Sequence, residues 1–321
     1  FQKLVRTGFG SNNVDHCTRL CHASSVAALL EGVGSGAVSA PFGAVKDAEV
    51  VMVIGANPSE NHPVAATYFK QAAKTRTLIV MDPRGMALKR HATHMLQFKP
   101  GSDVSMLNAM LNVIVTEKLY DQSYVDAHTE GFEHLRAHVK AFTPEAMAPI
   151  CGIEPDRIRE LGIAIGKARS MIVFWGMGIS QHVHGTDNVR CLIALATLTG
   201  HVGRPGTGLH PLRGQNNVQG ASDAGLIPMM LQDYGPVDSP DVRARFEDAW
   251  GTSLDPDRGL TVVEIMDAIH AGTVRGMYIM GVNPAMSDPD LDHARAGIAK
   301  LEHLVVQDIF LTETAMMADV I

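Results

Sequence analysis

The sequence predicts an α/β fold with mostly parallel sheets, and three observations support this class. Apolar runs of strand length recur along the chain, helical stretches separate them, and the runs are continuous rather than alternating. Continuous hydrophobicity is typical of strands buried on both faces, as in parallel sheets covered by helices. The 321 residues correspond to about two domains, at roughly 150 residues each.

Each expected element follows from its local pattern. The strands are short apolar runs at residues 50–54, 77–81, 171–175, 276–280 and 304–306. Residues 105–120 and 155–168 have the apolar spacing of amphipathic helices. Pro144 and Pro155 mark two helix starts, because proline is tolerated in the first turn of a helix.

Charge and cysteine content narrow the classes of partner and the compartment. Lys and Arg number 27 against 34 Asp and Glu, a net charge of −7, so the overall field does not attract nucleic acid or anionic lipid. Four scattered cysteines do not form the framework of a secreted scaffold, which favours a reducing, cytoplasmic location. No apolar stretch approaches the roughly 18 residues of a membrane span, so we expect no direct membrane insertion.

An internal repeat is the first functional signal. Residues 55–58 read Gly-Ala-Asn-Pro, residues 281–284 read Gly-Val-Asn-Pro, and each motif follows an expected strand. An aspartate follows the glycine by 27 residues in both copies, at Asp82 and Asp308. One copy is also typical of a strand-ending turn, but the matched spacing favours two Rossmann-like units that each bind a nucleotide-like group.

Two further segments carry unusual residues. Residues 213–220 read Arg-Gly-Gln-Asn-Asn-Val-Gln-Gly, which is either a solvated surface loop or a donor-rich binding loop. Cys17, Cys21 and His22 lie near an expected helix start. They leave four interpretations open: a nucleophilic thiolate, half of a zinc or iron–sulfur site, a ligand to a softer metal, and an ordinary buried cysteine.

The order of these motifs resembles that of molybdenum-dependent formate dehydrogenase catalytic subunits, of the molybdopterin oxidoreductase (dimethyl sulfoxide reductase) superfamily. The motifs are Cys21-His22, Gly55-Ala56-Asn57-Pro58, Met81-Asp82-Pro83-Arg84, Trp175-Gly176-Met177-Gly178, Arg213 to Gly220 and Gln307-Asp308-Ile309-Phe310. The resemblance covers essentially the whole chain. Within the superfamily, His22 after the cysteine and Arg213 at the start of the loop favour formate as substrate.

The resemblance implies a cofactor and a domain arrangement. Molybdenum would be held by two molybdopterin guanine dinucleotides, one on each of two Rossmann-like domains related by pseudo-twofold symmetry. The first domain would comprise residues 23–215, and the second, incomplete and discontinuous, residues 1–22 and 216–321. A preceding domain, absent here, would hold a [4Fe-4S] cluster, so we expect a central fragment that is inactive alone.

The resemblance also implies roles for individual residues. Cys21, where many relatives carry selenocysteine, would ligate molybdenum, His22 would accept a proton, and Arg213 would grip formate through two parallel hydrogen bonds. The cofactor-binding positions would be Gly55, Asn57, Glu60, Asp82, Arg84, Gly101, Asp103, Met177, Gln181, Gly214, Gln215, Gly281, Val282, Gln307, Asp308 and Ile309.

The implied activity is the interconversion of formate and carbon dioxide, with electrons passing to the iron–sulfur cluster. Expected partners are iron–sulfur or flavin-containing electron-transfer subunits, and no nucleic acid. Two alternatives remain open: another molybdopterin oxidoreductase, such as a nitrate reductase, and a relative that retains the fold only as a scaffold.

Overall fold

The computed structural model describes residues 1–321, and the chain divides into two compact units. We call Leu20–Asn216 the central unit, and Phe1–Arg19 together with Asn217–Ile321 the discontinuous unit. The short helix α2 (Thr18–Cys21) contains the first boundary. No helix combines the length and apolar character that crossing a membrane requires.

The central unit contains a five-stranded sheet in the order β3-β2-β1-β4-β5, with every neighbouring pair parallel. Its strands are β1 (Val50–Ile54), β2 (Thr77–Met81), β3 (His94–Leu96), β4 (Met171–Trp175) and β5 (Gly208–Pro211). The strand order reverses between β1 and β4. In open parallel sheets, ligands bind outside the carboxyl ends of the strands at such a reversal.

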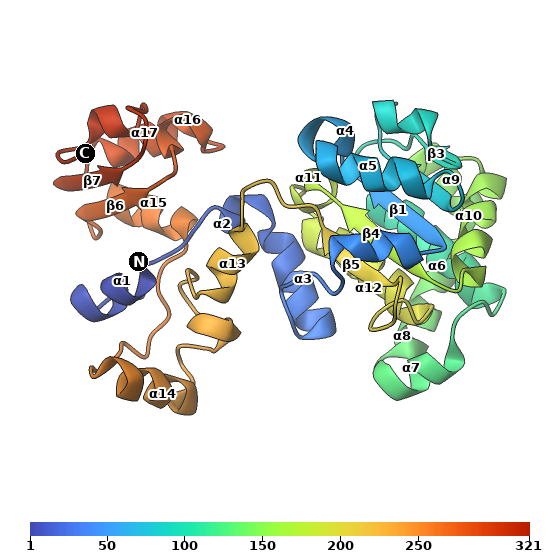
Figure 1. Ribbon diagram of the computed structural model, residues 1–321, viewed down its shortest axis with the longest axis horizontal. Coiled ribbons are helices and arrows are strands. Elements are labelled where there is room, and N and C mark those ends of the chain that lie inside the picture. The colour runs from blue at the N-terminus through green and yellow to red at the C-terminus, as the bar shows by residue number, and fades with distance from the viewer. The chain divides into compact units, whose positions relative to one another are not determined.

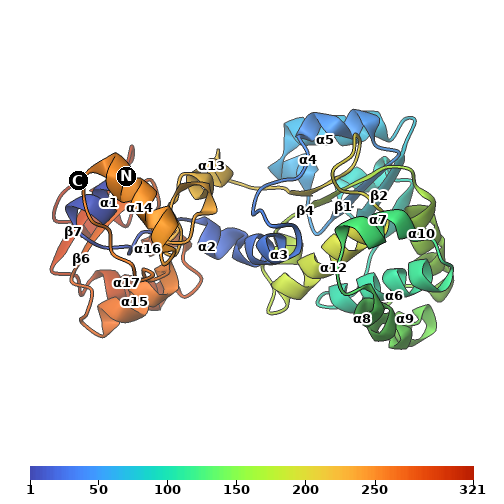
Figure 2. The same ribbon diagram turned by 90° about the horizontal axis from the view of Figure 1, so that it is seen from below.

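The sheet separates two hydrophobic cores, and successive residues of one strand enter opposite cores. Met52 and Ile54 of β1 belong to one core, while Val51 and Val53 belong to the other. Because both faces are buried, the strands are apolar at every position, as the continuous runs predicted. Figures 1 and 2 show α5 on one side of the sheet and α12 on the other.

The helices of the central unit are distributed between these cores. The larger core receives α3 (Ala23–Val33), α6 (Asp103–Thr116), α7 (Gln122–His128), α9 (Pro144–Cys151), α10 (Pro155–Lys167) and α12 (Gly185–Leu198). The smaller core receives η1 (Phe42–Asp47), α5 (Pro63–Ala72) and η2 (Ala87–Arg90). The larger core also contains Val139 of η3 (Val139–Ala141) and Ile179 of α11 (Met177–Ser180), and the remaining elements are α4 (Pro58–Asn61) and α8 (Phe132–His138).

The expected helices and their starts are confirmed, with one boundary shifted. Pro144 and Pro155 occupy the first turns of α9 and α10. The helix expected at residues 105–120 is α6, which ends at Thr116. Lys118 has a positive φ of 54°, and the amide of Leu119 donates to the Ile114 carbonyl at 2.8 Å. This turn ends the helix by returning the chain to an earlier carbonyl.

The discontinuous unit has its own core around a parallel pair of strands, β6 (Gly276–Met280) and β7 (His303–Gln307). Its helices are α1 (Gln2–Gly8), α13 (Val218–Asp223), η4 (Gln232–Tyr234), α14 (Pro240–Trp250), α15 (Val262–His270), α16 (Pro284–Ser287), α17 (Leu291–Ile298) and η5 (Ala315–Met317). Ile265 and Ile269 of α15 and Ile298 of α17 pack with Leu304 and Val306 of β7. Both chain ends belong to this unit (Figures 1 and 2).

Candidate functional site

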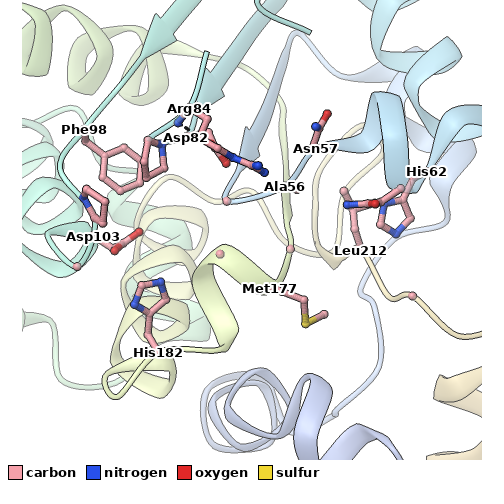
Figure 3. A pocket seen from close by; sticks show the side chains of 18 residues that line it. Ala56, Asn57, His62, Asp82, Arg84, Phe98, Asp103, Met177, His182 and Leu212 are labelled. Carbon is pink, nitrogen blue, oxygen red and sulfur yellow. Dashed lines mark hydrogen bonds and ion pairs between the residues drawn. The ribbon is translucent and has the colours of Figure 1, made fainter. Parts of the chain in front are cut away.

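A cavity of about 670 Å³ lies in the central unit, beyond the carboxyl ends of β1, β2 and β4. Its lining residues come from the segments that follow all five strands of the sheet and from the start of α6. They are Gly55, Ala56, Asn57, Asn61, His62, Asp82, Pro83, Arg84, Phe98, Pro100, Gly101, Asp103, Gly176, Met177, Gly178, His182, Leu212 and Gly214. Figure 3 shows Asp103 and His182 at one end of the cavity and His62 and Leu212 at the other.

Glycines bring two strand ends together at the floor of the cavity. Gly55 directly follows β1 and has a φ of +57°, and a Cβ there would lie 2.8 Å from the Gly178 carbonyl carbon. A Cβ on Gly176 would lie 2.7 Å from the Gly55 carbonyl oxygen. Only glycine permits both the left-handed conformation and this close backbone approach. The glycines therefore shape the crevice at the strand-order reversal.

The carboxylates of the cavity are buried and differ in their partners. Asp82 accepts a hydrogen bond from the Arg84 amide at 2.8 Å, and burial raises its pKa. Asp103 begins α6, is only 2% exposed, and its Oδ1 has no hydrogen-bond partner. Burial also raises the pKa of Asp103, with His182 opposing that effect electrostatically. Both carboxyl groups are placed to accept N–H donors from a bound group.

The Asn57 side chain is also buried, and its amide oxygen has no hydrogen-bond donor. It directly precedes α4, it is 8% exposed, and its Oδ1 has no partner. A buried acceptor without a donor costs about 1–3 kcal/mol, so such an atom in a cavity wall suits a ligand that supplies the donor.

Cys21 is half-buried at the end of α2. Its sulfur lies 3.7 Å from Met177 Sδ and 3.9 Å from Gln215 Oε1. Burial raises the pKa of the Cys21 thiol, while the Gly214 backbone and the Arg213 charge oppose that shift. A raised pKa does not support the nucleophilic-thiolate interpretation. No group of three or more His, Cys, Asp or Glu side chains is placed to hold a metal ion, so zinc or iron–sulfur ligation finds no ligand set within this structure.

His22 is 1% exposed, and both of its ring nitrogens are engaged. Nε2 donates to the Leu212 carbonyl at 3.2 Å, and Nδ1 lies 2.8 Å from Ser180 Oγ and 3.3 Å from Ser25 Oγ. A carbonyl oxygen only accepts, so Nε2 carries the proton and Nδ1 accepts from a serine hydroxyl. Burial lowers the pKa of His22 to about 4. The imidazole is therefore neutral at pH 7 and tied to its neighbours.

Arg213 follows β5 and Leu212, and its side chain is anchored within the central unit. Its Nη2 donates to the Gly36 carbonyl at 2.7 Å. Its own carbonyl accepts a hydrogen bond from His62 Nε2 at 2.9 Å. The backbone and one end of the guanidinium are thus both fixed.

The sequence pattern of the molybdopterin oxidoreductase family matches residues 1–321. The chain belongs to this family. The F420-dependent formate dehydrogenase subunit alpha of Methanocaldococcus jannaschii is 41% identical over the whole chain, which covers 47% of that protein. Formate dehydrogenase H of Escherichia coli is also 41% identical over the whole chain, which covers 45% of its length. The chain thus spans about half the length of the curated relatives it matches.

A solved structure supports the fold of this molybdopterin oxidoreductase. Acetylene hydratase from Pelobacter acetylenicus has a TM-score of 0.78 and 20% identity, covering 100% of this chain and 46% of that one. At this identity the likeness concerns the fold alone. It confirms the α/β class with mostly parallel sheets, and the family match confirms the resemblance read from the motifs.

Family membership implies a molybdopterin cofactor, and the cavity residues fit such a group. Asn57 and Asp103 offer buried acceptors without partners, and a Cβ at Gly101 or Gly214 would meet nothing within 4 Å. The cavity volume of about 670 Å³ is within the usual range for cofactor-sized ligands.

Of the other residues to which the sequence assigns cofactor binding in the central unit, some line the cavity and others do not. Arg84, Gly101 and Met177 line the cavity, whereas Glu60 is exposed on α4 and is absent from the lining. Gln181 is bonded through Nε2 to the Leu20 carbonyl at 2.8 Å.

In the discontinuous unit, the assigned residues surround the carboxyl ends of β6 and β7. Gly281 has a φ of +64°, and Val282 is exposed. Gln307 accepts a hydrogen bond from Tyr278 Oη, and Asp308 accepts from the amide of Ile309 at 2.7 Å.

Sequence reasoning missed several residues that line the cavity. His62 joins α4 to α5, His182 follows α11, and Phe98 follows β3. His62 is four residues after the Gly-Ala-Asn-Pro motif, but only the fold brings its imidazole to the Arg213 carbonyl. The available signal was a histidine before a proline, just after a strand-ending turn, which by itself indicates no role.

Proposed function

We propose that the protein to which this chain belongs oxidises formate to carbon dioxide, or runs the reverse reaction. The observation that carries the proposal is the joint placement of Cys21 and the Arg213 loop beside one cavity. The Cys21 sulfur lies 3.9 Å from Gln215 Oε1, and Gly214 lines that cavity. The two formate dehydrogenases at 41% identity support formate as the substrate.

The proposed cofactor is molybdenum held by two molybdopterin guanine dinucleotides, one bound by each Gly-x-Asn-Pro repeat. In the central unit, Asp82 and Asp103 would accept N–H groups of guanine or hydroxyl groups of ribose. Asn57 Oδ1 would accept a further donor from the dinucleotide. Buried carboxylates distinguish guanine through its adjacent N–H donors, which their oxygens can accept in pairs.

Formate oxidation yields carbon dioxide, one proton and two electrons. When bound, the molybdenum–pterin group supplies a two-electron sink for cleavage of the C–H bond. The Arg213 guanidinium would hold the formate carboxylate through two parallel hydrogen bonds and orient its C–H bond. Cys21 would supply a soft thiolate ligand.

His22 would receive the proton at Nδ1. In the present conformation that atom is occupied by Ser180 Oγ at 2.8 Å, so proton uptake requires this hydroxyl to turn away. Nε2 would remain bonded to the Leu212 carbonyl and keep the ring in place.

We also propose a route for the electrons. They would pass through a [4Fe-4S] cluster to an iron–sulfur or flavin-containing partner subunit in a reducing, cytoplasmic compartment. The Methanocaldococcus relative is named as a subunit alpha, which supports a multi-subunit assembly.

The test is to produce the full-length protein anaerobically and to measure molybdenum, guanine nucleotide and formate-dependent viologen reduction. We expect molybdenum and formate activity. In Arg213→Lys, which keeps the charge but loses the planar fork, we expect a higher KM and a lower kcat. Absence of molybdenum would support a scaffold instead, and nitrate reduction without formate oxidation would support a nitrate reductase.

A further inference from the structure

Two imidazoles in the central unit hold the carbonyl groups of consecutive residues. His22 Nε2 donates to the Leu212 carbonyl at 3.2 Å, and His62 Nε2 donates to the Arg213 carbonyl at 2.9 Å. A carbonyl oxygen has no proton to give, so each imidazole must carry its proton on Nε2. Both histidines therefore act on the backbone immediately before and at Arg213.

The backbone of His62 is itself firmly placed. Its amide donates to the Pro58 carbonyl at 3.0 Å, and Pro63 follows it directly at the start of α5. Proline disfavours the helical conformation at the residue before it, and the φ and ψ of His62, −140° and 61°, lie outside the helical region. Figure 3 shows the ring beside Leu212 at one end of the cavity.

The loop after Arg213 is otherwise held through Cys21, whose sulfur interacts with the Gly214 backbone and lies 3.9 Å from Gln215 Oε1. Residues 214–217 are exposed, and nothing lies within 4 Å of a Cβ built on Gly214. Glycine at position 214 would let the Arg213–Gly214 peptide rotate if the Arg213 carbonyl were released from His62. The hydrogen bond from His62 thus acts where the chain leaves the sheet for an exposed loop.

We infer that His62 is a positioning residue that sets the direction of the Arg213 side chain by holding its carbonyl. The guanidinium also donates to the Gly36 carbonyl at 2.7 Å, so backbone and side chain are fixed from opposite ends. Loss of the His62 hydrogen bond would let the backbone of residue 213 rotate. The guanidinium would then move away from the orientation in which it bonds to the Gly36 carbonyl. The kinetic part of this inference rests on the proposed formate activity.

Trypsin provides a test that does not depend on activity, because it cleaves the Arg213–Gly214 bond through the carbonyl that His62 holds. In the full-length holoprotein, His62→Phe should accelerate this cleavage by about two- to tenfold, the value of one net hydrogen bond. His62→Gln, whose amide can donate to the same carbonyl, should restore slow cleavage. His134→Phe, an exposed histidine on α8, is the matched control and should leave the rate unchanged.

Cleavage after Arg90, an exposed residue distant in sequence from the loop, is the internal reference for protease activity, and the melting temperature of each variant measures general unfolding. Unchanged cleavage after Arg213 in His62→Phe would overturn the inference. Equal acceleration in the Phe and Gln variants would overturn it as well, because the effect would then come from lost ring packing. If His62→Phe does not accumulate, His62→Leu takes its place in the test, because it removes the same hydrogen-bond donor.

A double-mutant cycle tests the link to Arg213. His62→Phe should raise the KM for formate by about fivefold in the parent enzyme and have little effect in the Arg213→Lys background. Equal effects in both backgrounds would assign His62 a role independent of Arg213 and overturn the inference. If the parent protein shows no formate activity, the proposed function fails, while the trypsin result still decides whether His62 holds the loop.

Discussion

The two Gly-x-Asn-Pro repeats share one backbone structure. Gly55 and Gly281 have φ values of +57° and +64°, and each leads into a four-residue helix, α4 or α16. The amide of Gly55 donates to the Met81 carbonyl at 2.9 Å, and that of Gly281 donates to the Gln307 carbonyl at the same distance. The repeat in the sequence is therefore a repeat in hydrogen bonding, at the ends of paired parallel strands.

The side chains of the two repeats differ. Asn57 Oδ1 is buried without a partner, whereas Asn283 Oδ1 accepts from the Thr314 amide at 3.1 Å and from Thr314 Oγ1 at 2.7 Å. Asn283 Nδ2 also donates to Glu313 at 2.7 Å. The asparagine of the second repeat is bonded within the protein, while that of the first has a buried acceptor without a donor.

This difference shows that one backbone motif supports two hydrogen-bonding arrangements of its asparagine side chain. In the central unit the cost of an unsatisfied acceptor, about 1–3 kcal/mol, would be recovered when a ligand donates to it. In the discontinuous unit the Thr314 contact would first have to break. We therefore expect the two repeats to respond differently to equivalent substitutions.

The largest difference is expected for alanine at the two glycines. Gly55→Ala adds a clash with the Gly178 backbone to the strain of a left-handed φ, so we expect about 3 kcal/mol or more of destabilisation. At Gly281 nothing lies within 4 Å of the added Cβ, so only the strain of about 1–2 kcal/mol remains. Hydrogen exchange of peptides spanning β1 and β6 would measure both, and equal losses would contradict the difference in packing.

The second-largest difference is expected in how the stability of each unit depends on low pH. Burial lowers the pKa of His201 and of His210, both in the central unit, to about 4. Their ordinary value is 6.5, so unfolding takes up protons between these pH values. Each neutral histidine therefore makes its full contribution to the free energy of unfolding above pH 6.5. That contribution, on the order of 2–3 kcal/mol, is lost as the pH falls toward 4.

The discontinuous unit has a lower acid window, because Thr261 hydrogen bonds lower the pKa of Glu264 to about 2. Its stabilisation is lost only below the ordinary glutamate value of 4.5. Hydrogen exchange near pH 5 should therefore increase first in β1 peptides, and His201→Leu should reduce that increase. Earlier exchange in β6 would contradict the assignment.

Alanine substitutions at the two asparagines should affect different properties, protein stability for Asn283 and cofactor retention for Asn57. Asn283→Ala removes the bonds to Thr314 and Glu313, so we expect about 1–2 kcal/mol of destabilisation in the discontinuous unit. Asn57→Ala removes an unpartnered acceptor, so the cofactor-free protein should lose less stability while the holoprotein retains less cofactor. Denaturant unfolding and nucleotide content measure the two effects, and a reversed pattern would show that Asn57 is not a ligand acceptor.

The sequence predicted the interior of the central sheet but not its edges. β1, β2 and β4 are continuous apolar runs because both of their faces are buried. β3 and β5 lie at the two edges and contain His94, Gly208 and Pro211, so they lack that pattern. Their pairing depends on the neighbouring strand rather than on local sequence.

The same distinction applies to the site. Asn57 and Asp82 follow predicted strands, so their place at the sheet edge could be inferred from the parallel arrangement. The roles of His22 and His62 depend on carbonyls far away in sequence, at Leu212 and Arg213. No local pattern specifies those contacts.

The smallest change in stability is expected where the repeats are most alike. Asp82 accepts from the amide two residues on at 2.8 Å, and Asp308 accepts from that of Phe310 at 3.2 Å. Asn can form the same turn, so Asp82→Asn and Asp308→Asn should each change the free energy of unfolding by less than about 0.5 kcal/mol. The amide removes the charge and one of the two acceptors that guanine requires.

Guanine nucleotide content then tests whether both repeats bind the cofactor. Under the proposed arrangement, acid release from the full-length holoprotein should yield two guanine nucleotides per molybdenum in the parent, with a deficit of up to one in each variant. A deficit in Asp82→Asn alone would restrict dinucleotide binding to the central unit. The internal bonds of Asn283 would then explain why a repeated backbone lacks a repeated ligand, because its acceptor is already used.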